Sequence, residues 1–312
     1  MNNNRVTLNV STNDAGQTIF SFVKKMYKKM LITEIYKLFR NKDIKINGKK
    51  TKDRKVILEK DDVIEIYYPN INKFESTKIV KKINFDFDYS KINIEDWILY
   101  EDDNLMLVNK PHGWEVHSNF NMSLDGLLQY KYSQKYKNEN NFKISHINRI
   151  DKYTSGIVLY AKNLKALSYF NKNISKVSKK YLAKVQGVFP EVSVVEGYIY
   201  KNEDNNKMIF NKTEYDDAQF AKTRFKVLER YIDFSIIEIE LLTGRKHQIR
   251  ATLNYLKHPV VNDVKYGAKH VFKAPKIELY SYYVGFKELD NGFEYLNGKI
   301  IVNEKLINEV NL

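Results

Sequence analysis

The sequence contains no cysteine, and this absence removes several classes of site at once. Without cysteine the chain has no disulfide, no thiolate ligand for a metal and no cysteine nucleophile. The 6 histidines show no H-E-x-x-H pair, so a zinc site is not expected. We therefore predict no metal centre, and the composition is compatible with a reducing compartment such as the cytoplasm.

Glycine motifs and long apolar runs are also missing. The 12 glycines include no pair separated by a single residue, which excludes the G-x-G dinucleotide fingerprint, and there is no G-x-x-x-x-G-K-[ST] phosphate loop. No stretch reaches the length of a membrane-spanning helix, and the start MNNNRVTLNV lacks the apolar core of a signal peptide. We expect no cofactor, no membrane association and a cytoplasmic protein.

Positive charge is in excess. The 312 residues include 52 Lys and Arg against 38 Asp and Glu, a formal net charge of +14. Residues 1–70 contribute half of that excess, with 15 basic and 8 acidic residues. Such a balance favours a polyanionic partner, either nucleic acid or an acidic membrane surface, although it can also serve solubility alone.

Residues 1–70 are predicted to form a compact unit. Apolar residues at helical spacing predict helices over 19–26 and 32–39, the second with Thr33 as its N-cap. The run DIKINGKK then alternates apolar and polar residues and ends at Asn47-Gly48, a strong hairpin signal, before VIEIYY forms a second strand.

Strands dominate the rest of the chain. Residues 71–94 are polar without a clear period, which predicts a linker to a domain over 95–312. Runs of branched and aromatic residues predict strands at 104–110, 156–162, 181–187, 234–244 and 276–286, and helical stretches are expected at 123–136, 163–176 and 246–257. This mixture indicates an α+β fold with a mixed or antiparallel sheet.

The stretch IYKLFRNKDIKINGKK (35–50), followed by LEKDDVIEI (58–66), resembles the S-four-type RNA-binding domain. The resemblance implies that residues 1–70 bind RNA. A positive face suits contacts with a phosphate backbone and would bind with strong salt dependence. Its candidate members are Lys37, Arg40, Lys42, Lys45, Lys49 and Lys50. The alternative is a solvated charged helix and turn.

A second informative segment is ISHINRIDKYTSGIVLYAKN (144–163). Arg149 and Asp151 precede a Thr-Ser-Gly turn that leads into an apolar strand. On the residues alone, Asp151 could cap the turn or belong to an active-site loop. The run N-R-I-D-K-Y-T-S-G resembles the signature R-L-D-x-x-T-S-G of the RluA family of pseudouridine synthases, in which the aspartate is catalytic.

The resemblance continues along the chain in the family's order. It includes YEDDNLMLVNKPHGWEVHSN (100–119), KKYLAKVQG (179–187) and LLTGRKHQIRATLNYLKHPVVNDVKYG (241–267). With the N-terminal unit, the matches extend over residues 15–286. Asn148, Ile150 and Thr252 depart from residues that are frequent in the family, which bears on the RNA target more than on the reaction.

The resemblance implies an isomerase that converts uridine to pseudouridine in RNA without a cofactor. Asp151 is then the nucleophile, attacking either the base or the ribose, and Arg250 keeps it ionised. Tyr181 stacks on the uracil or acts as a general base. Further RNA contacts are expected at Lys110, Arg149, Thr154, Ser155, Arg245 and Lys246.

Large-subunit ribosomal RNA is the expected partner of a monomeric enzyme. Two alternatives stay open at this point: the same reaction on transfer RNA, or a non-catalytic ribosome-associated RNA-binding or assembly factor.

Overall fold

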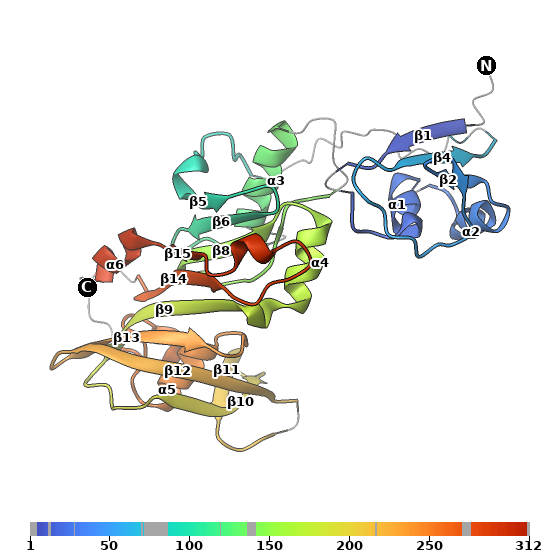
Figure 1. Cartoon of the computed structure of the whole chain (residues 1–312). Coiled ribbons are helices and arrows are strands. Elements are labelled where there is room, and N and C mark those ends of the chain that lie inside the picture. The colour runs from blue at the N-terminus through green and yellow to red at the C-terminus, as the bar shows by residue number, and fades with distance from the viewer. Residues whose placement is uncertain are drawn as a thin grey trace.

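The computed structural model contains two sheets. It describes residues 5–11, 14–27, 29–69, 71, 87–118, 120–135, 142–215, 217–269 and 276–310. A four-stranded sheet lies in the N-terminal part, and an 11-stranded sheet occupies the rest. Nearly all strand pairs are antiparallel and helices pack beside them, which confirms the α+β prediction. Figure 1 shows the N-terminal elements, in blue, to one side of the larger sheet.

The N-terminal sheet has the order β1-β4-β2-β3 and is accompanied by two helices. The bounds are β1 Arg5–Asn9, α1 Ile19–Met26, α2 Ile32–Arg40, β2 Ile44–Ile46, β3 Lys49–Lys50 and β4 Val63–Tyr67. Both helices match the predicted spans. Thr18 caps α1 through its side chain, whereas α2 begins after Leu31, without a side-chain cap, so Thr33 is not its N-cap.

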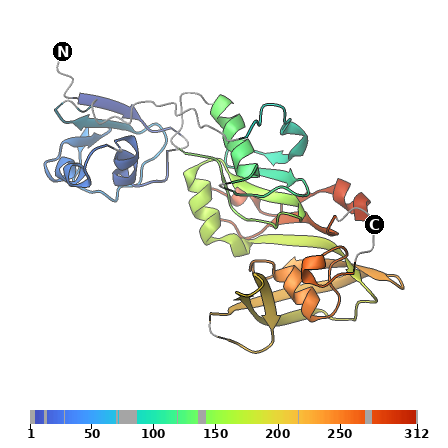
Figure 2. The ribbon, with the colours of Figure 1, turned by 180° about the vertical axis from the view of Figure 1, so that it is seen from behind.

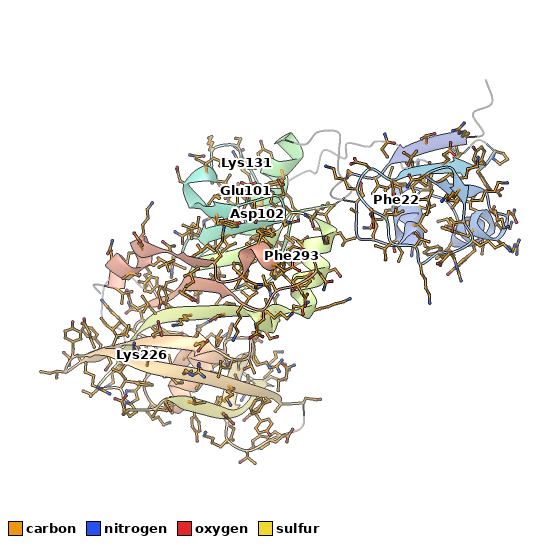
Figure 3. The ribbon with its side chains drawn as sticks, viewed as in Figure 1. Phe22, Glu101, Asp102, Lys131, Lys226 and Phe293 are labelled. Atoms are coloured by element: carbon orange, nitrogen blue, oxygen red, sulfur yellow. The ribbon has the colours of Figure 1, made fainter. Side chains whose placement is uncertain are left out.

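The predicted hairpin is present. Ile46 pairs with Lys49, and the two intervening residues, Asn47 and Gly48, have φ values of 49° and 77°. Positive φ at both positions is what a two-residue hairpin loop requires, and Asn-Gly is the pair that adopts it at least cost. Phe22 and its apolar neighbours fill a separate core between the helices and this sheet (Figure 3).

The larger sheet has the order β11-β10-β12-β13-β9-β14-β8-β6-β5, with β15 pairing with β14 and β7 with β8. Its strands are β5 Ile98–Glu101, β6 Leu105–Lys110, β7 Ser145–His146, β8 Ser155–Ala161, β9 Val177–Gln186, β10 Val194–Asn202, β11 Lys207–Asn211, β12 Gln219–Arg230, β13 Phe234–Leu241, β14 Leu279–Phe286 and β15 Ile300–Val302. All five predicted strands are found, and β8, which is buried throughout, runs parallel to β14.

Helices and short 3-10 segments connect these strands. They are η2 Glu95–Trp97, α3 Leu124–Lys135, α4 Leu164–Lys172, η3 Ile174–Lys176, α5 Gln248–Tyr255, η4 Val264–Tyr266, η5 Glu294–Leu296 and α6 Glu304–Val310. Figure 2 shows α5 in front of the strands β10 to β13. Among the described residues, no helix is long and apolar enough to cross a lipid bilayer.

Candidate active site

Asp151 lies in the loop that connects β7 to β8. The backbone N–H of Thr154 donates to the carbonyl of Asp151 at 3.1 Å, which closes the predicted turn. Ile150 and Thr154 are buried on either side, whereas the Asp151 side chain keeps 23% of its surface exposed. The loop therefore anchors its apolar residues and presents one carboxylate to a partly open space.

Arg250, in the first turn of α5, meets that carboxylate. Its Nη1 donates to Oδ2 of Asp151 at 3.0 Å. Its other two nitrogens bind Asp263 in a bidentate arrangement: Nε donates to Oδ2 at 2.6 Å and Nη2 to Oδ1 at 2.8 Å. Asp263 is fully buried and Arg250 nearly so. A planar guanidinium held at two nitrogens has one fixed orientation, so Nη1 points at Asp151.

Charge pairing stabilises this buried arginine. Burial by itself lowers the pKa of Arg250, but the hydrogen bonds and negative charge of Asp263 raise it above its ordinary value overall. The guanidinium also lies 4.6 Å from the ring centroid of Tyr266, a cation–π contact. Arg250 is therefore a permanent positive charge beside Asp151.

His247 completes the surroundings of Asp151. Its Nδ1 lies 2.7 Å from the hydroxyl of Tyr266, and its Nε2 lies 3.8 Å from Oδ1 of Asp151. Burial lowers the pKa of His247, which favours the neutral imidazole. His247 also has a positive φ of 51° at the N-cap of α5, a conformation that costs energy for a non-glycine residue.

Tyr181 projects from β9 into the same pocket. Its side chain is almost entirely buried, and burial raises the pKa of Tyr181 well above its usual range, more than a hydrogen bond with Ser281 lowers it. The hydroxyl is therefore a neutral phenol in the free protein. It offers a ring face and a hydrogen-bonding group rather than a phenolate base.

The pocket brings the three predicted catalytic residues together. It is a shallow pocket of about 50 Å³ that opens to solvent. The residues that line it are Arg149, Ile150, Asp151, Thr154, Tyr181, Leu241, Arg245, His247, Gln248, Ile249, Arg250 and Leu279. An ionisable carboxylate, a fixed guanidinium, a phenol and apolar walls can hold a flat heterocycle and carry out nucleophilic chemistry on it.

Lys110 is placed differently from the expectation. Its side chain is fully buried, and its Nζ donates to the carbonyls of Pro111, Trp114 and Lys152 at 3.0, 2.8 and 3.0 Å. Burial lowers the pKa of Lys110 to about 7. The predicted phosphate contact is wrong for this position, because the amine is enclosed by protein. Lys110 instead ties the loop after β6 to the loop that carries Asp151.

The other residues predicted to contact RNA fall into an exposed group and a buried group. Arg149, Arg245 and Lys246 are exposed at or near the mouth of the pocket, as a phosphate contact requires. Thr154 and Ser155, also predicted to contact RNA, are buried: Thr154 lines the pocket and Ser155 begins β8. Their contact with RNA stays a prediction, and for Thr154 it would be made inside the pocket.

The basic residues of the N-terminal unit are mostly exposed. These are Lys37, Arg40, Lys42, Lys49 and Lys50, with Lys45 partly buried. Lys37 pairs with Glu34 at 2.7 Å, and Lys45 lies 3.8 Å from Glu65. The remaining four present their charges to solvent on α2, the turn after it and the hairpin.

The sequence interpretation gave no role to Asp263 or Tyr266. Both belong to the D-x-x-Y-G run at the end of the third matched segment, which was the signal available for them. Gln248 holds the loop before α5 in place: its Oε1 accepts from the backbone N–H of Arg245 and the hydroxyl of Thr243, and its Nε2 donates to the hydroxyl of Thr223.

Comparison with known proteins gives one consistent result. A family model described as RNA pseudouridylate synthase matches residues 104–255. An uncharacterized RNA pseudouridine synthase of Mycoplasma capricolum is 36% identical over 302 residues, covering 94% of this chain and 95% of the relative. Ribosomal large subunit pseudouridine synthase C of Buchnera aphidicola is 30% identical, covering 84% of this chain and 81% of the relative.

A solved structure shares the fold. Human RNA Pseudouridylate Synthase Domain Containing 4 aligns with a TM-score of 0.57 at 21% identity, covering 70% of this chain and 93% of the human chain. At that identity the likeness concerns the fold, and it agrees with the mixed sheet and α+β class described above.

Proposed function

The chain belongs to the RluA family of RNA pseudouridine synthases and is an isomerase acting on RNA, and we propose that it modifies specific uridines of large-subunit ribosomal RNA with Asp151 as the nucleophile. The observation that carries the proposal is the 3.0 Å hydrogen bond from Arg250 to Asp151 at the wall of a pocket that Tyr181 also lines. The choice of large-subunit RNA rests on relatives whose names state that activity.

The reaction exchanges one bond for another. The bond from uracil nitrogen 1 to the ribose breaks, a bond from carbon 5 to the ribose forms, and the proton leaves carbon 5 while nitrogen 1 gains one. Whether the nucleophile attacks the base or the ribose, it must be ionised when the uracil arrives. The guanidinium of Arg250 places a positive charge 3.0 Å from this carboxylate in the partly buried site.

Tyr181 and the apolar walls are proposed to hold the base. A uridine inside structured RNA must leave its stack to reach the pocket, at a cost of a few kcal/mol. The Tyr181 ring, together with Leu241 and Leu279, offers a surface on which the extruded uracil rests. Because the Tyr181 phenol is neutral in the free protein, it acts on the base by stacking and hydrogen bonding.

Exposed arginines at the mouth are proposed to bind the RNA backbone. Arg149 and Arg245 line the outer part of the pocket, and Lys246 follows in the same exposed loop. Positive charges there offset the cost of base extrusion by contacting the phosphates that flank the target nucleotide. We assign residues 1–70 to an RNA-binding domain, 71–94 to a linker and 95–312 to a monomeric catalytic domain; most of 71–94 falls outside the described residues.

Pseudouridine mapping of total RNA from cells with and without this gene tests the assignment. The expected result is the loss of one or more sites in large-subunit ribosomal RNA, restored by the wild-type gene. Loss confined to transfer RNA would replace the proposed target. An unchanged map together with a growth defect that an Asp151→Asn gene fully rescues would identify a non-catalytic assembly factor instead.

A further inference from the structure

Tyr153 is an exposed aromatic residue in the loop that carries Asp151. Its side chain is 45% exposed, although its neighbour Thr154 is buried. Asp151 and Thr154 both line the pocket, whereas Tyr153 stands outside it. We propose that the ring of Tyr153 stacks on the nucleobase next to the target uridine in the RNA, so that it selects and orients the strand at the rim of the pocket.

The ring is held in place from one side. The imidazole of His112 packs against it, with ring centroids 5.5 Å apart and an interplanar angle of 37°. The Nζ of Lys152 lies 5.8 Å from the ring centroid. Part of the ring surface is therefore covered by protein, and the exposed remainder is available for stacking.

The backbone beneath the ring is fixed as well. The carbonyl of Lys152 accepts two hydrogen bonds, from Nζ of Lys110 and from the backbone N–H of Gly113, each 3.0 Å long. On the other side of Tyr153, the backbone N–H of Thr154 donates to the carbonyl of Asp151, which closes the turn that contains Tyr153. Because the Tyr153 ring is already held in one position, a base that stacks on it does not have to order it first. Binding therefore costs less conformational entropy than stacking on a mobile ring would.

The surroundings favour an RNA base as the occupant. Arg149 and Lys152 are exposed cations in the same short loop, which suits a polyanion. If one uridine is extruded into the pocket, as the proposed function requires, its neighbouring nucleotides lie near the loop that carries both Asp151 and Tyr153. Aromatic rings beside cations are the usual way in which proteins bind unstacked RNA bases.

The inference rests on the proposed function, so the experiment measures binding and catalysis separately. Full-length protein carrying Tyr153→Ala or Tyr153→Phe is compared with wild type on an unmodified transcript of the organism's large-subunit ribosomal RNA. Filter binding gives Kd, and pseudouridine formation gives kcat and KM. The matched control is Tyr231→Ala, which removes a ring of equal exposure, 45%, that packs on Phe234 in the turn between β12 and β13.

We expect Tyr153→Ala to raise Kd and KM roughly 5- to 150-fold, the range that stacking of one base provides, with kcat nearly unchanged. Tyr153→Phe and Tyr231→Ala should behave like wild type. An unchanged Kd in Tyr153→Ala would overturn the inference, and so would an equal loss in Tyr153→Phe, since the hydroxyl rather than the ring would then be responsible. Wild-type protein that forms no pseudouridine in this transcript would instead refute the proposed target.

Discussion

Asp151 and Arg250 lie 99 residues apart in the sequence, yet Nη1 of Arg250 is 3.0 Å from Oδ2 of Asp151. The guanidinium reaches this position because Asp263 binds its other two nitrogens. The order Asp263–Arg250–Asp151 runs from full burial to partial exposure. A buried carboxylate thus fixes the cation that in turn orients the carboxylate facing the pocket.

Asp263→Asn should lower kcat far more than RNA affinity. The substitution keeps the shape but removes the charge and one acceptor, so the guanidinium of Arg250 loses its fixed orientation. Misplacement of a reacting group by about 1 Å costs on the order of 100-fold in rate. The measurement is kcat and Kd on the same transcript. Asp290→Asn, which breaks an exposed pair with Lys176, serves as the control and should leave both unchanged. If RNA affinity fell by the same factor as kcat, the positioning role would be contradicted.

The buried amine of Lys110 should make stability depend on pH. Its pKa is about 7 in the folded protein, lowered by burial, and about 10.5 when unfolded. Between these two pKa values the unfolded chain binds more protons than the folded chain, so the free energy of unfolding rises with pH. This added stability is lost again as the pH falls toward 7. From pH 7 to 9 we expect a gain of about 2 kcal/mol that Lys110→Met lacks.

Urea unfolding can measure this gain. Trp97 and Trp114 are the two tryptophans of the chain and lie in contact, so their fluorescence reports on the catalytic part. Lys226, on β12, is exposed, and Lys226→Met should keep the pH slope of wild type (Figure 3). Equal slopes in wild type and Lys110→Met would show that Lys110 does not titrate in this range.

Gly156 should tolerate no side chain. Its φ is +118°, and a Cβ atom built there would lie 2.1 Å from the carbonyl oxygen of Ser281 on the neighbouring parallel strand. Gly156→Ala must therefore separate β8 from β14, and we expect it to lower the free energy of unfolding by roughly 3 kcal/mol or to prevent folding. Gly244 has no described heavy atom within 4 Å of such a Cβ, so Gly244→Ala should unfold like wild type in the same urea titration.

The basic hairpin should contribute to RNA affinity through charge alone. Lys49 and Lys50 are exposed on β3, and replacing both with Gln removes two candidate phosphate contacts. The slope of log Kd against log salt concentration should fall by about 2, whatever the RNA sequence. Lys201→Gln, at an exposed pair with Glu203, is the control. An unchanged slope in the double variant would exclude this surface from RNA binding.

The sequence predicted correctly those helices, strands and turns whose formation depends on residues close together in the chain. Asn47-Gly48 forms its hairpin because both residues accept positive φ, and β8 is buried throughout as its apolar run indicates. The strands β10, β11 and β12 were not predicted. β12 alternates exposed and buried residues, with charges among the exposed ones, so it lacks the continuous apolar run that predicted the other strands.

The site was only partly readable from the sequence. The motif resemblance named Asp151, Tyr181 and Arg250, and all three line one pocket. It could not reveal that Lys110 is enclosed, because one of the three carbonyls around it belongs to a residue 42 positions away. Asp263 escaped notice for a similar reason: its pairing with Arg250 depends on how the chain after α5 folds back.

The most direct test of the account is pseudouridine formation by purified Asp151→Asn protein on the large-subunit ribosomal RNA transcript. Asparagine has the shape of aspartate but lacks its negative charge, so it cannot serve as the ionised nucleophile, while its fold and RNA contacts should persist. We predict no detectable product, with Kd and urea unfolding close to wild type. Product formed at the wild-type rate would show that the carboxylate of Asp151 is not the nucleophile.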